Sequence, residues 1–365
     1  MIYRAIGLMS GSSLDGLDIA FVSFTEQGGK WSYQIENAAT YSYDANWSNA
    51  LKSFDSLSSR EYLLLHAKYG HYLGQQVNKF IDENNLHFKV ALIASHGHTS
   101  FHMPAEGMTA QLGDGAAIAA ETGLTVISDL RSLDVALNGQ GAPIVPIGEK
   151  FLFSNYTYLL NIGGIANISN QGKEYRAFDI CAANRVLNML ARDAGKAYDE
   201  DGKIASSGVV NDSLLDQLNA LEYYAKPFPK SLANEFGIEV VYPMIKLANI
   251  STADAMATYC VHVAEQVKNA IALVKYPSVA TDAEQLLITG GGAHNKHLIN
   301  CITSAVSSLG ITVVVPDANI INYKEALIMA FIGVLRFRQE NNVLSSVTGA
   351  KADSVGGAIW NGQPA

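Results

Sequence analysis

Hydroxyl, carboxylate and glycine residues are concentrated in one short turn near the start of the chain. Residues 11–18 read GSSLDGLD and join two apolar runs, 3–10 and 17–24, that predict strands. A plain hairpin turn needs only two or three such residues. Glycines let a phosphate approach backbone N–H groups, and carboxylates such as Asp15 and Asp18 can hold Mg²⁺. The turn therefore suits a nucleotide phosphate with its metal ion, and the alternative is a decorated surface hairpin.

Two further glycine clusters follow predicted buried strands. One is Gly163-Gly164 in NIGGIAN, and the other is residues 290–292 in TGGGAHN, which leads into a predicted helix. A glycine pair weakens a strand unless a ligand or backbone must approach closely, and anions dock at helix N-termini. One cluster is weak evidence, but three of them favour a nucleotide cleft. The P-loop pattern GxxxxGK[ST] and the Rossmann pattern GxGxxG are both absent from the sequence.

Two carboxylates stand beside predicted buried elements. Asp179 ends the apolar stretch AFD and precedes a helix predicted at 183–194. Burial raises the pKa of such a carboxyl and suits it to general-base work, and a helix N-cap is the alternative. Glu325 lies in the first turn of a helix predicted at 323–340, where an ordinary solvated side chain is the simplest interpretation.

Arg131 could recognise an acidic ligand. It lies in SDLRSLD, between Asp129 and Asp134. Arginine binds a carboxylate through two parallel hydrogen bonds. An Arg–Asp pair that stabilises a domain junction is an equally good interpretation.

Three histidines lie close together in SHGHTSFHMP: His96, His98 and His102. A zinc site needs further ligands, and no carboxylate or cysteine pattern accompanies these histidines. A polar loop that contacts a sugar or another hydroxyl-rich ligand fits the segment better. A purely structural loop is the remaining alternative.

Composition places the chain among globular proteins with about two domains. Of its 365 residues, 48% are hydrophobic and 16% charged, and the net charge is −9. No block of Lys or Arg occurs, so neither nucleic acid nor an anionic membrane is an expected partner. The scattered cysteines Cys181, Cys260 and Cys301 fit a reducing compartment. With no signal segment and no apolar run of about 18 residues, we expect a cytoplasmic protein.

Strands and helices alternate along the chain, which predicts an α/β fold. A hairpin followed by further strands and helices occurs twice, which suggests two related lobes with the glycine turns facing each other across a cleft. We expect an N-terminal lobe of residues 1–128 and 341–365 and a C-terminal lobe of residues 129–340, because NGQGAPIVP interrupts regular structure between them. The other expected strands are 31–43, 90–95, 124–128 and the hairpin 157–169, and the other expected helices are 60–85 and 250–275.

Seven segments, in order over nearly the whole chain, resemble motifs of the 1,6-anhydro-N-acetylmuramic acid kinase family, which belongs to the sugar kinase, Hsp70 and actin superfamily. The resemblance implies two ribonuclease H-like lobes of the actin/hexokinase type with an ATP cleft between them. The segments are GLMSGSSLDGLD, SHGHT, DLRSLDVALNGQGAPIVP, LNIGGIANIS, AFDICAAN, TGGGAHN and KEALIMAF.

The resemblance also implies an activity. Family members use ATP and Mg²⁺ to phosphorylate O6 of 1,6-anhydro-N-acetylmuramic acid while water opens the anhydro ring. The product is N-acetylmuramic acid 6-phosphate, formed in peptidoglycan recycling, and a homodimer is usual. The alternatives are a kinase of a related anhydro or amino sugar and a non-catalytic, sugar-responsive ATP-binding protein.

Site residues follow from the resemblance motif by motif. Asp179 matches the catalytic aspartate, and Arg131 matches a sugar-binding arginine. The expected substrate-binding residues are His96, His98, Arg131, Asp134 and Glu325. The expected ATP-binding residues are Gly11, Ser12, Ser13, Leu14, Asp15, Gly16, Leu17, Asp18, Gly163, Gly164, Gly290, Gly291 and Gly292. The sequence departs from the family pattern at Ser12 (usually Thr), His98 (usually Gln), Asn138 (usually Gly) and in DICAAN (usually DTGPGN).

Overall fold

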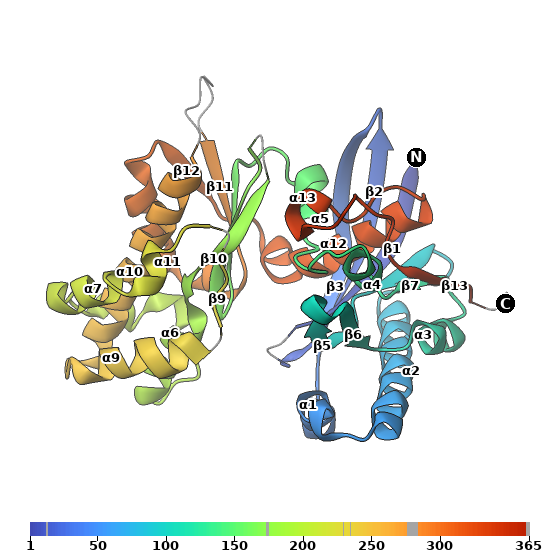
Figure 1. Cartoon of the computed structure of the whole chain (residues 1–365), viewed down its shortest axis with the longest axis horizontal. Helices are drawn as coiled ribbons and strands as arrows, with labels where there is room; N and C mark the ends of the chain where they lie inside the picture. Colours follow the sequence, from blue (N-terminus) through green and yellow to red (C-terminus); the bar gives the residue numbers. More distant parts are fainter. Residues whose placement is uncertain (12–13, 173–174, 229, 234, 276–283, 363–365) are drawn as a thin grey trace. The chain divides into compact units, whose positions relative to one another are not determined.

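The chain folds as two compact units. The computed structural model describes residues 1–11, 14–172, 175–228, 230–233, 235–275 and 284–362. Unit 1 comprises Met1–Phe153 and Tyr323–Ala365, and unit 2 comprises Ser154–Asn322. Figure 1 shows the course of the chain through both units.

This division differs from the expected lobes. Residues 129–153 and 323–340, expected in the C-terminal lobe, belong to unit 1. The reason is packing, because α5 (Pro146–Leu152) contacts β3 (Lys30–Ser42). Gly148 of α5 also lies so close to Ile328 of α12 (Ala318–Phe337) that a Cβ on Gly148 would be 2.6 Å from its side chain. A break in regular structure that is predicted from the sequence shows where a helix begins, but it does not show against which sheet that helix packs.

Unit 1 contains a six-stranded sheet with the order β13-β7-β4-β1-β2-β3. The strands β1, β2 and β3 form an antiparallel meander, β4 runs parallel to β1, β7 runs parallel to β4, and β13 is antiparallel to β7. Central strand β1 has a buried run, whereas edge strand β3 alternates along its length. Besides β3, the strands of this sheet are β1 (Ile2–Ser10), β2 (Gly16–Gln27), β4 (Leu92–Ser95), β7 (Val126–Ser128) and β13 (Ala358–Trp360). Unit 1 also contains a separate hairpin formed by β5 (His98–Met103) and β6 (Met108–Leu112).

Unit 2 contains a five-stranded sheet with the order β10-β9-β8-β11-β12. Here β8, β9 and β10 form the antiparallel meander, β11 runs parallel to β8, and β12 runs parallel to β11. Both sheets therefore have three antiparallel strands followed by two parallel ones, which is the ribonuclease H-like arrangement and confirms the expected fold class. The strands are β8 (Tyr158–Ile162), β9 (Ile165–Asn170), β10 (Arg176–Ala182), β11 (Glu284–Thr289) and β12 (Ile311–Val314).

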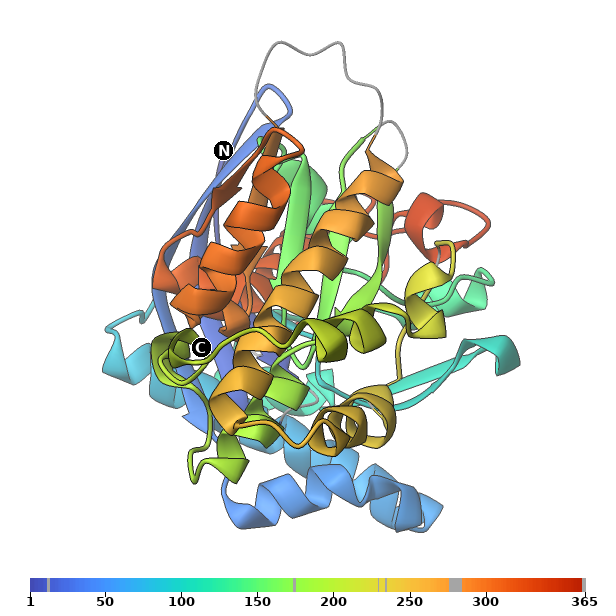
Figure 2. The ribbon, with the colours of Figure 1, turned by 90° about the vertical axis from the view of Figure 1, so that its left-hand side faces the viewer.

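Helices cover the sheets. In unit 2, α10 contacts both β10 and α11, and Figure 2 shows α10 and α11 lying over one face of the sheet. The remaining helices of unit 1 are α1 (Ala45–Lys52), α2 (Ser59–Glu83), α3 (Gly115–Thr122), α4 (Ser132–Ala136) and α13 (Ser345–Thr348). Those of unit 2 are α6 (Asn184–Asp193), α7 (Asp212–Asn219), α8 (Glu222–Ala225), α9 (Tyr242–Leu247), α10 (Thr252–Val274) and α11 (Lys296–Ser307).

Local sequence explains where several helices begin and end. Ser58 and Glu61 form a reciprocal capping box at the start of α2. Asp114 caps the start of α3, and Gly123 ends it with a φ of 67°, a left-handed conformation that favours glycine. Ser251 caps α10. Gly123 and Ser251 thus mark the end of α3 and the start of α10.

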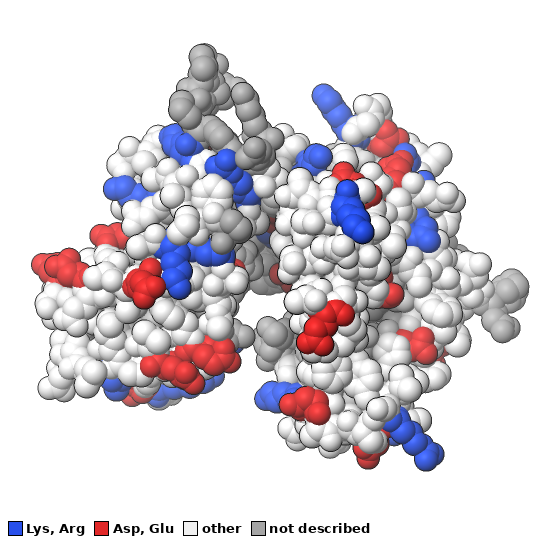
Figure 3. All heavy atoms as spheres, viewed as in Figure 1, with Lys and Arg blue, Asp and Glu red and all other residues white. Residues whose placement is uncertain are grey.

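Helix α12 is long and apolar enough to cross a membrane, alone among the helices of the described residues. The sequence has no uninterrupted apolar run of this length, because Lys324 and Glu325 interrupt the helix. Of its most apolar window, 72% is buried inside the protein, which is typical of a core helix. On the face of the molecule drawn in Figure 3, Lys and Arg side chains are interspersed with Asp and Glu side chains.

We expect Gly7→Ala to destabilise the protein. Gly7 lies in β1 where α12 crosses it, and a Cβ there would be 1.9 Å from the carbonyl oxygen of Ala326. Because this neighbour is backbone, α12 must shift, and overpacking of this kind costs about 1–3 kcal/mol. Urea denaturation would measure the loss, with Arg4→Ala at an exposed position of the same strand as the control. An unchanged free energy of unfolding in Gly7→Ala would contradict this packing.

Candidate active site

The first glycine turn connects β1 to β2. Ser12 and Ser13, both expected to bind ATP, lie outside the described residues. On either side of them, the N–H of Leu14 donates to the carbonyl of Gly11 at 3.4 Å, and Leu14 has a φ of 56°. Gly11 and Leu14 are therefore in contact where the sequence predicts a phosphate turn.

Two residues of this motif have structural reasons for their identity. A Cβ on Gly16 would lie 2.7 Å from the carbonyl oxygen of Tyr41, so the pairing of β2 with β3 requires glycine there. Leu17 is 1% exposed and belongs to the core of unit 1, so its side chain cannot reach a nucleotide. Among the described residues of this turn, the carboxylates of Asp15 and Asp18 could hold a metal ion beside a phosphate.

Asp18 is a carboxylate of this turn whose ionisation is perturbed. The pKa of Asp18 is raised to about 6, mainly by burial and also by the nearby carboxylates of Asp15 and Glu325. A hydrogen bond from Thr40 Oγ1 at 2.6 Å acts in the opposite direction. Three carboxylates in one region of unit 1 repel one another, so a cation beside Asp18 would stabilise its ionised form.

The second glycine turn connects β8 to β9 in unit 2. A Cβ on Gly163 would meet no atom closer than 3.5 Å, and one on Gly164 none closer than 3.6 Å among the described residues. Neither glycine has a positive φ. Packing and backbone conformation therefore do not explain this pair, whereas close approach of a ligand would.

The third glycine cluster, between β11 and α11, divides into two kinds of position. Gly290 has a φ of 81°, and a Cβ there would lie 2.5 Å from Asn161 Oδ1. A Cβ on Gly292 would lie 2.3 Å from the side chain of Ile162. Both are required by the fold of unit 2. A Cβ on Gly291 would lie 3.6 Å from the side chain of Asn184, which is an ordinary contact distance. Packing therefore does not require glycine at this position, whereas close approach of a ligand would.

Asp179 lies in the middle of β10, not at its end as expected, and at an irregularity in the pairing with β9. Its Oδ2 accepts a hydrogen bond from the N–H of Leu232 at 2.9 Å, and its own N–H donates to the carbonyl of Lys230. Burial raises the pKa of Asp179, and the Leu232 N–H partly offsets this. The N-cap alternative is wrong, because α6 has Ala183 at its N-cap.

Arg131 lies directly before α4 in unit 1. Its Nη1 donates to the carbonyl of Gly141 at 2.5 Å, while Nε and Nη2 lie 2.9 and 2.8 Å from Nε2 of His96. Its hydrogen bonds thus go to His96 and Gly141 rather than to Asp129 or Asp134. Burial lowers the pKa of Arg131 to about 10, against the attraction of Glu325 and Asp134, so the side chain is charged at neutral pH.

Asp134 stabilises the loop that contains Gly141. It is fully buried, and its carboxylate accepts hydrogen bonds from the N–H of Gly141 at 2.8 Å and from Thr348 Oγ1 at 2.7 Å. A Cβ on Gly139 would lie 2.2 Å from Asp134 Oδ2. Both carboxylate oxygens are occupied by the protein, so this geometry favours a structural role over the expected substrate contact.

Glu325 is not in the first turn of its helix, because α12 begins at Ala318, five residues before the predicted start at 323. Burial raises its pKa, and Lys324 and Arg131 oppose the rise. Lys324 forms a buried ion pair of 2.9 Å with Glu149 of α5. The interpretation of Glu325 as an ordinary solvated side chain is therefore wrong.

Of the three histidines, His98 and His102 lie in strand β5, which starts at His98, and His96 lies in the connection that follows β4. His98 Nδ1 lies 3.1 Å from Ser10 Oγ, which also accepts a hydrogen bond from Tyr43. His102 Nδ1 lies 3.0 Å from Thr109 Oγ1. In the described part of the chain, no three His, Cys, Asp or Glu side chains are grouped as a metal site would require. A zinc site at these histidines is therefore not supported.

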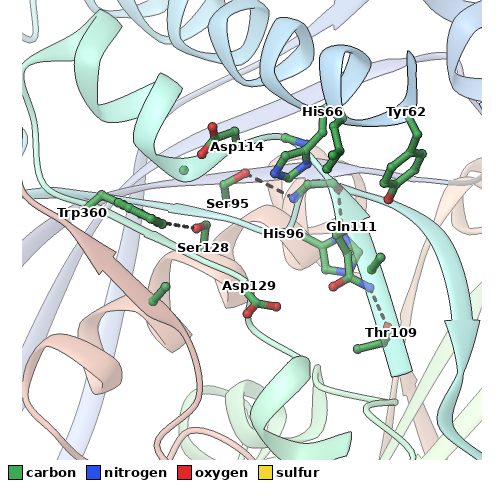
Figure 4. Close-up of a pocket in the computed structure, with 16 residues that line it drawn as sticks. Tyr62, His66, Ser95, His96, Thr109, Gln111, Asp114, Ser128, Asp129 and Trp360 are labelled. Atoms are coloured by element: carbon green, nitrogen blue, oxygen red, sulfur yellow. Dashed lines mark hydrogen bonds between the residues drawn. The ribbon is translucent and has the colours of Figure 1, made fainter. Parts of the chain in front are cut away.

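A pocket of about 360 Å³ opens in unit 1 beside His96. Figure 4 shows Tyr62 and His66 of α2, Gln111 of β6 and Asp129 after β7 around it. The sequence prediction missed all four as pocket residues. For Asp129 a usable signal existed, because it follows the short buried strand β7 at the carboxyl end, where α/β sheets bind ligands.

Comparisons with known proteins place this chain in a family. The family model for anhydro-N-acetylmuramic acid kinase matches residues 3–362. Proteins named anhydro-N-acetylmuramic acid kinase are 33% identical in Hydrogenovibrio crunogenus, with 98% of this chain and 97% of that protein covered, and 31% identical in Coxiella burnetii, with 99% and 98% covered. A solved structure, the activator of the 2-hydroxyisocaproyl-CoA dehydratase from Clostridium difficile with bound ADPNP, covers 92% of this chain and 97% of its own, at 14% identity and a TM-score of 0.46. By the match of the whole sequence, this chain belongs to the anhydro-N-acetylmuramic acid kinase family.

Proposed function

We propose that this protein is an ATP-dependent kinase that phosphorylates O6 of 1,6-anhydro-N-acetylmuramic acid with hydrolytic opening of the anhydro ring. The product is N-acetylmuramic acid 6-phosphate, which returns cell-wall sugar to metabolism. The observation that carries the proposal is the family match over residues 3–362. The placement of Asp179, Arg131 and Glu325 described above is compatible with it.

The chemistry needs a base. The anhydro sugar has no free 6-hydroxyl, so its bridging oxygen becomes nucleophilic only as its bond to C1 breaks. Water must attack C1 and lose a proton, and a carboxylate with a raised pKa is suited to accept it. Asp179 is our candidate, since its Oδ2 is held by the Leu232 N–H while burial raises its pKa.

ATP and Mg²⁺ are the other expected participants. Mg²⁺ keeps several waters and takes one or two carboxylates besides substrate phosphates. Asp18 fits this role, because its carboxyl is destabilised in the ionised form by burial and by Asp15 and Glu325. Bound there, Mg²⁺ would neutralise charge on the transferred phosphoryl group. The backbone of the turns at Gly11 and Gly164 would contact the phosphates.

A coupled assay of ADP release tests the proposed function. We expect release that depends on anhydro-N-acetylmuramic acid and on Mg²⁺, with N-acetylmuramic acid 6-phosphate identified by mass spectrometry. Release with only another anhydro or amino sugar would assign a different substrate. ATP binding without release for any of these sugars would identify a sugar-responsive binding protein instead.

Arg131→Lys is expected to weaken sugar binding. We assign the lactyl carboxylate to Arg131, and lysine keeps the charge but loses the paired donors. KM for the anhydro sugar should rise about tenfold, because loss of a hydrogen bond to a charged group weakens binding by roughly this factor. KM for ATP should change little. Arg192→Lys, at an exposed position of α6, is the matched control. Equal KM values for the sugar in wild type and Arg131→Lys would refute the assignment.

Two further expectations concern the state of the protein. The family resemblance implies a homodimer in the cytoplasm. Light scattering coupled to size exclusion would measure the mass against the 39.2 kDa of one chain. A single species at that mass would contradict the dimer.

A further inference from the structure

His96 and Arg131 form a pair that the sequence does not reveal. His96 lies directly after β4, is 4% exposed, and has its N–H bonded to the carbonyl of Leu8 in the neighbouring strand. Its ring is thereby held at the sheet. The guanidinium of Arg131 approaches Nε2 with both Nε and Nη2, at 2.9 and 2.8 Å.

The neighbouring backbone selects the form of the His96 ring. Nδ1 lies 3.0 Å from the carbonyl oxygen of Gly97, which can only accept a hydrogen bond. Nδ1 must therefore carry the proton, and Nε2 is left with the lone pair that Arg131 requires. Gly97 has a φ of 69°, which favours glycine and turns its carbonyl toward this ring. Burial and the charge of Arg131 lower the pKa of His96 to about 3, so the ring is neutral at physiological pH.

The donors of Arg131 can be accounted for one by one. Arginine has five N–H groups in a planar fork. Nε and one hydrogen of Nη2 face His96, and one hydrogen of Nη1 faces Gly141. One hydrogen remains on Nη1 and one on Nη2, the two nitrogens at the end of the fork. This end has the geometry that binds a carboxylate through two parallel hydrogen bonds.

We propose that His96 is a positioning residue: its neutral Nε2 holds the inner edge of Arg131 so that the outer edge is presented to the carboxylate of the substrate. The inference rests on the proposed function for the identity of that substrate. It changes the role expected for His96, which supports the sugar-binding residue and does not contact the sugar. Gly141, held by Asp134, provides the second support of the guanidinium.

Other charged and titratable groups around the pair agree with this role. Glu325 of α12 and Asp134 of α4 stabilise the charge of Arg131. His98 and His102 of β5 also lie near the pair, and burial lowers the pKa of both. His66, Asp114 and Asp129 line the same pocket as His96. Arg131 is a cation beside these histidines, so an anionic ligand would approach its guanidinium.

The test uses the full chain with His96→Leu and His96→Gln. Leucine removes the acceptor, whereas glutamine places an amide oxygen near the position of Nε2. KM for the anhydro sugar should rise about tenfold in His96→Leu and return to within about threefold of wild type in His96→Gln. KM for ATP and kcat should change by less than about threefold in both variants. Unchanged KM for the sugar in a folded His96→Leu protein would overturn the proposal.

Two controls separate positioning from a general loss of structure. His71→Leu, at an exposed position of α2, should leave all constants unchanged. The double variant His96→Leu/Arg131→Lys should be no worse than Arg131→Lys alone, because both changes remove one interaction. Fully additive losses would show that His96 acts independently of Arg131 and would also overturn the proposal.

A measurement without substrate separates this proposal from the proposed function. The ¹⁵N shifts of His96 in the ligand-free protein should report a neutral ring protonated at Nδ1, and the Nε2 shift should move in Arg131→Lys. A ring protonated at Nε2 would disprove the pair. If wild type shows no activity on the anhydro sugar, the proposed function fails, and these shifts alone decide whether His96 holds Arg131.

Discussion

Asp179→Asn is expected to lower kcat by at least about 10²-fold, within the range of general-base catalysis, while both substrates still bind. Asparagine keeps the shape of the side chain, and its Oδ1 can accept the Leu232 N–H that now binds Asp179 Oδ2. It cannot accept a proton from water. Calorimetry would measure binding separately from turnover, because KM reports affinity only when chemistry is slow.

The pH profile gives an independent reading of the same residue. Burial raises the pKa of Asp179 above its ordinary 3.8, so the ionised base is present above that raised pKa and is lost as pH falls through it. Wild-type kcat should show this acidic limb, and Asp179→Asn should lack it. Asp216→Asn, at an exposed position of α7, is the matched control and should behave as wild type. Turnover of Asp179→Asn within about threefold of wild type, with chemistry rate-limiting, would exclude Asp179 as the base.

Gly164→Val is expected to abolish nucleotide binding without damage to the fold. Space for a Cβ exists at Gly164, since the nearest described atom would be 3.6 Å away, and the backbone has no positive φ. A valine there would instead occupy the space that we assign to a phosphate. Affinity for a non-hydrolysable ATP analogue should fall at least about 100-fold, which corresponds to about 2.7 kcal/mol.

A substitution at Gly164 allows the effect on nucleotide binding to be measured separately from the effect on stability. Gly290→Ala would be less informative, because a Cβ there would strike Asn161 and Ile162 and weaken unit 2 itself. Thermal denaturation should give the same midpoint for Gly164→Val and wild type. Ala220→Val, at an exposed position of the same unit, is the control for added bulk. Unchanged affinity for the ATP analogue in Gly164→Val would show that this turn is an ordinary hairpin turn that does not contact a phosphate.

Much of the fold was predictable because its signals are local. The hairpin β1–β2, helices α2 and α10, and the end of α3 at Gly123 follow from periodicity, capping residues and one left-handed glycine. The hairpin β5–β6 was missed because it is polar and half-exposed, and β13 was missed because it has three residues. Such short elements are strands only because a neighbour supplies their hydrogen bonds.

The sequence by itself determined the family, the repeated α/β layout and the residue types available to the proposed reaction, because these depend on motifs read along the chain. Tertiary structure alone decided which groups meet. His96 and Arg131 are 35 residues apart, and Lys324 and Glu149 are 175 apart. Packing of strands and helices brings each pair together, and burial then sets the ionisation of Asp18, Asp179 and Glu325. No local pattern encodes that burial, since it depends on every element that surrounds the side chain.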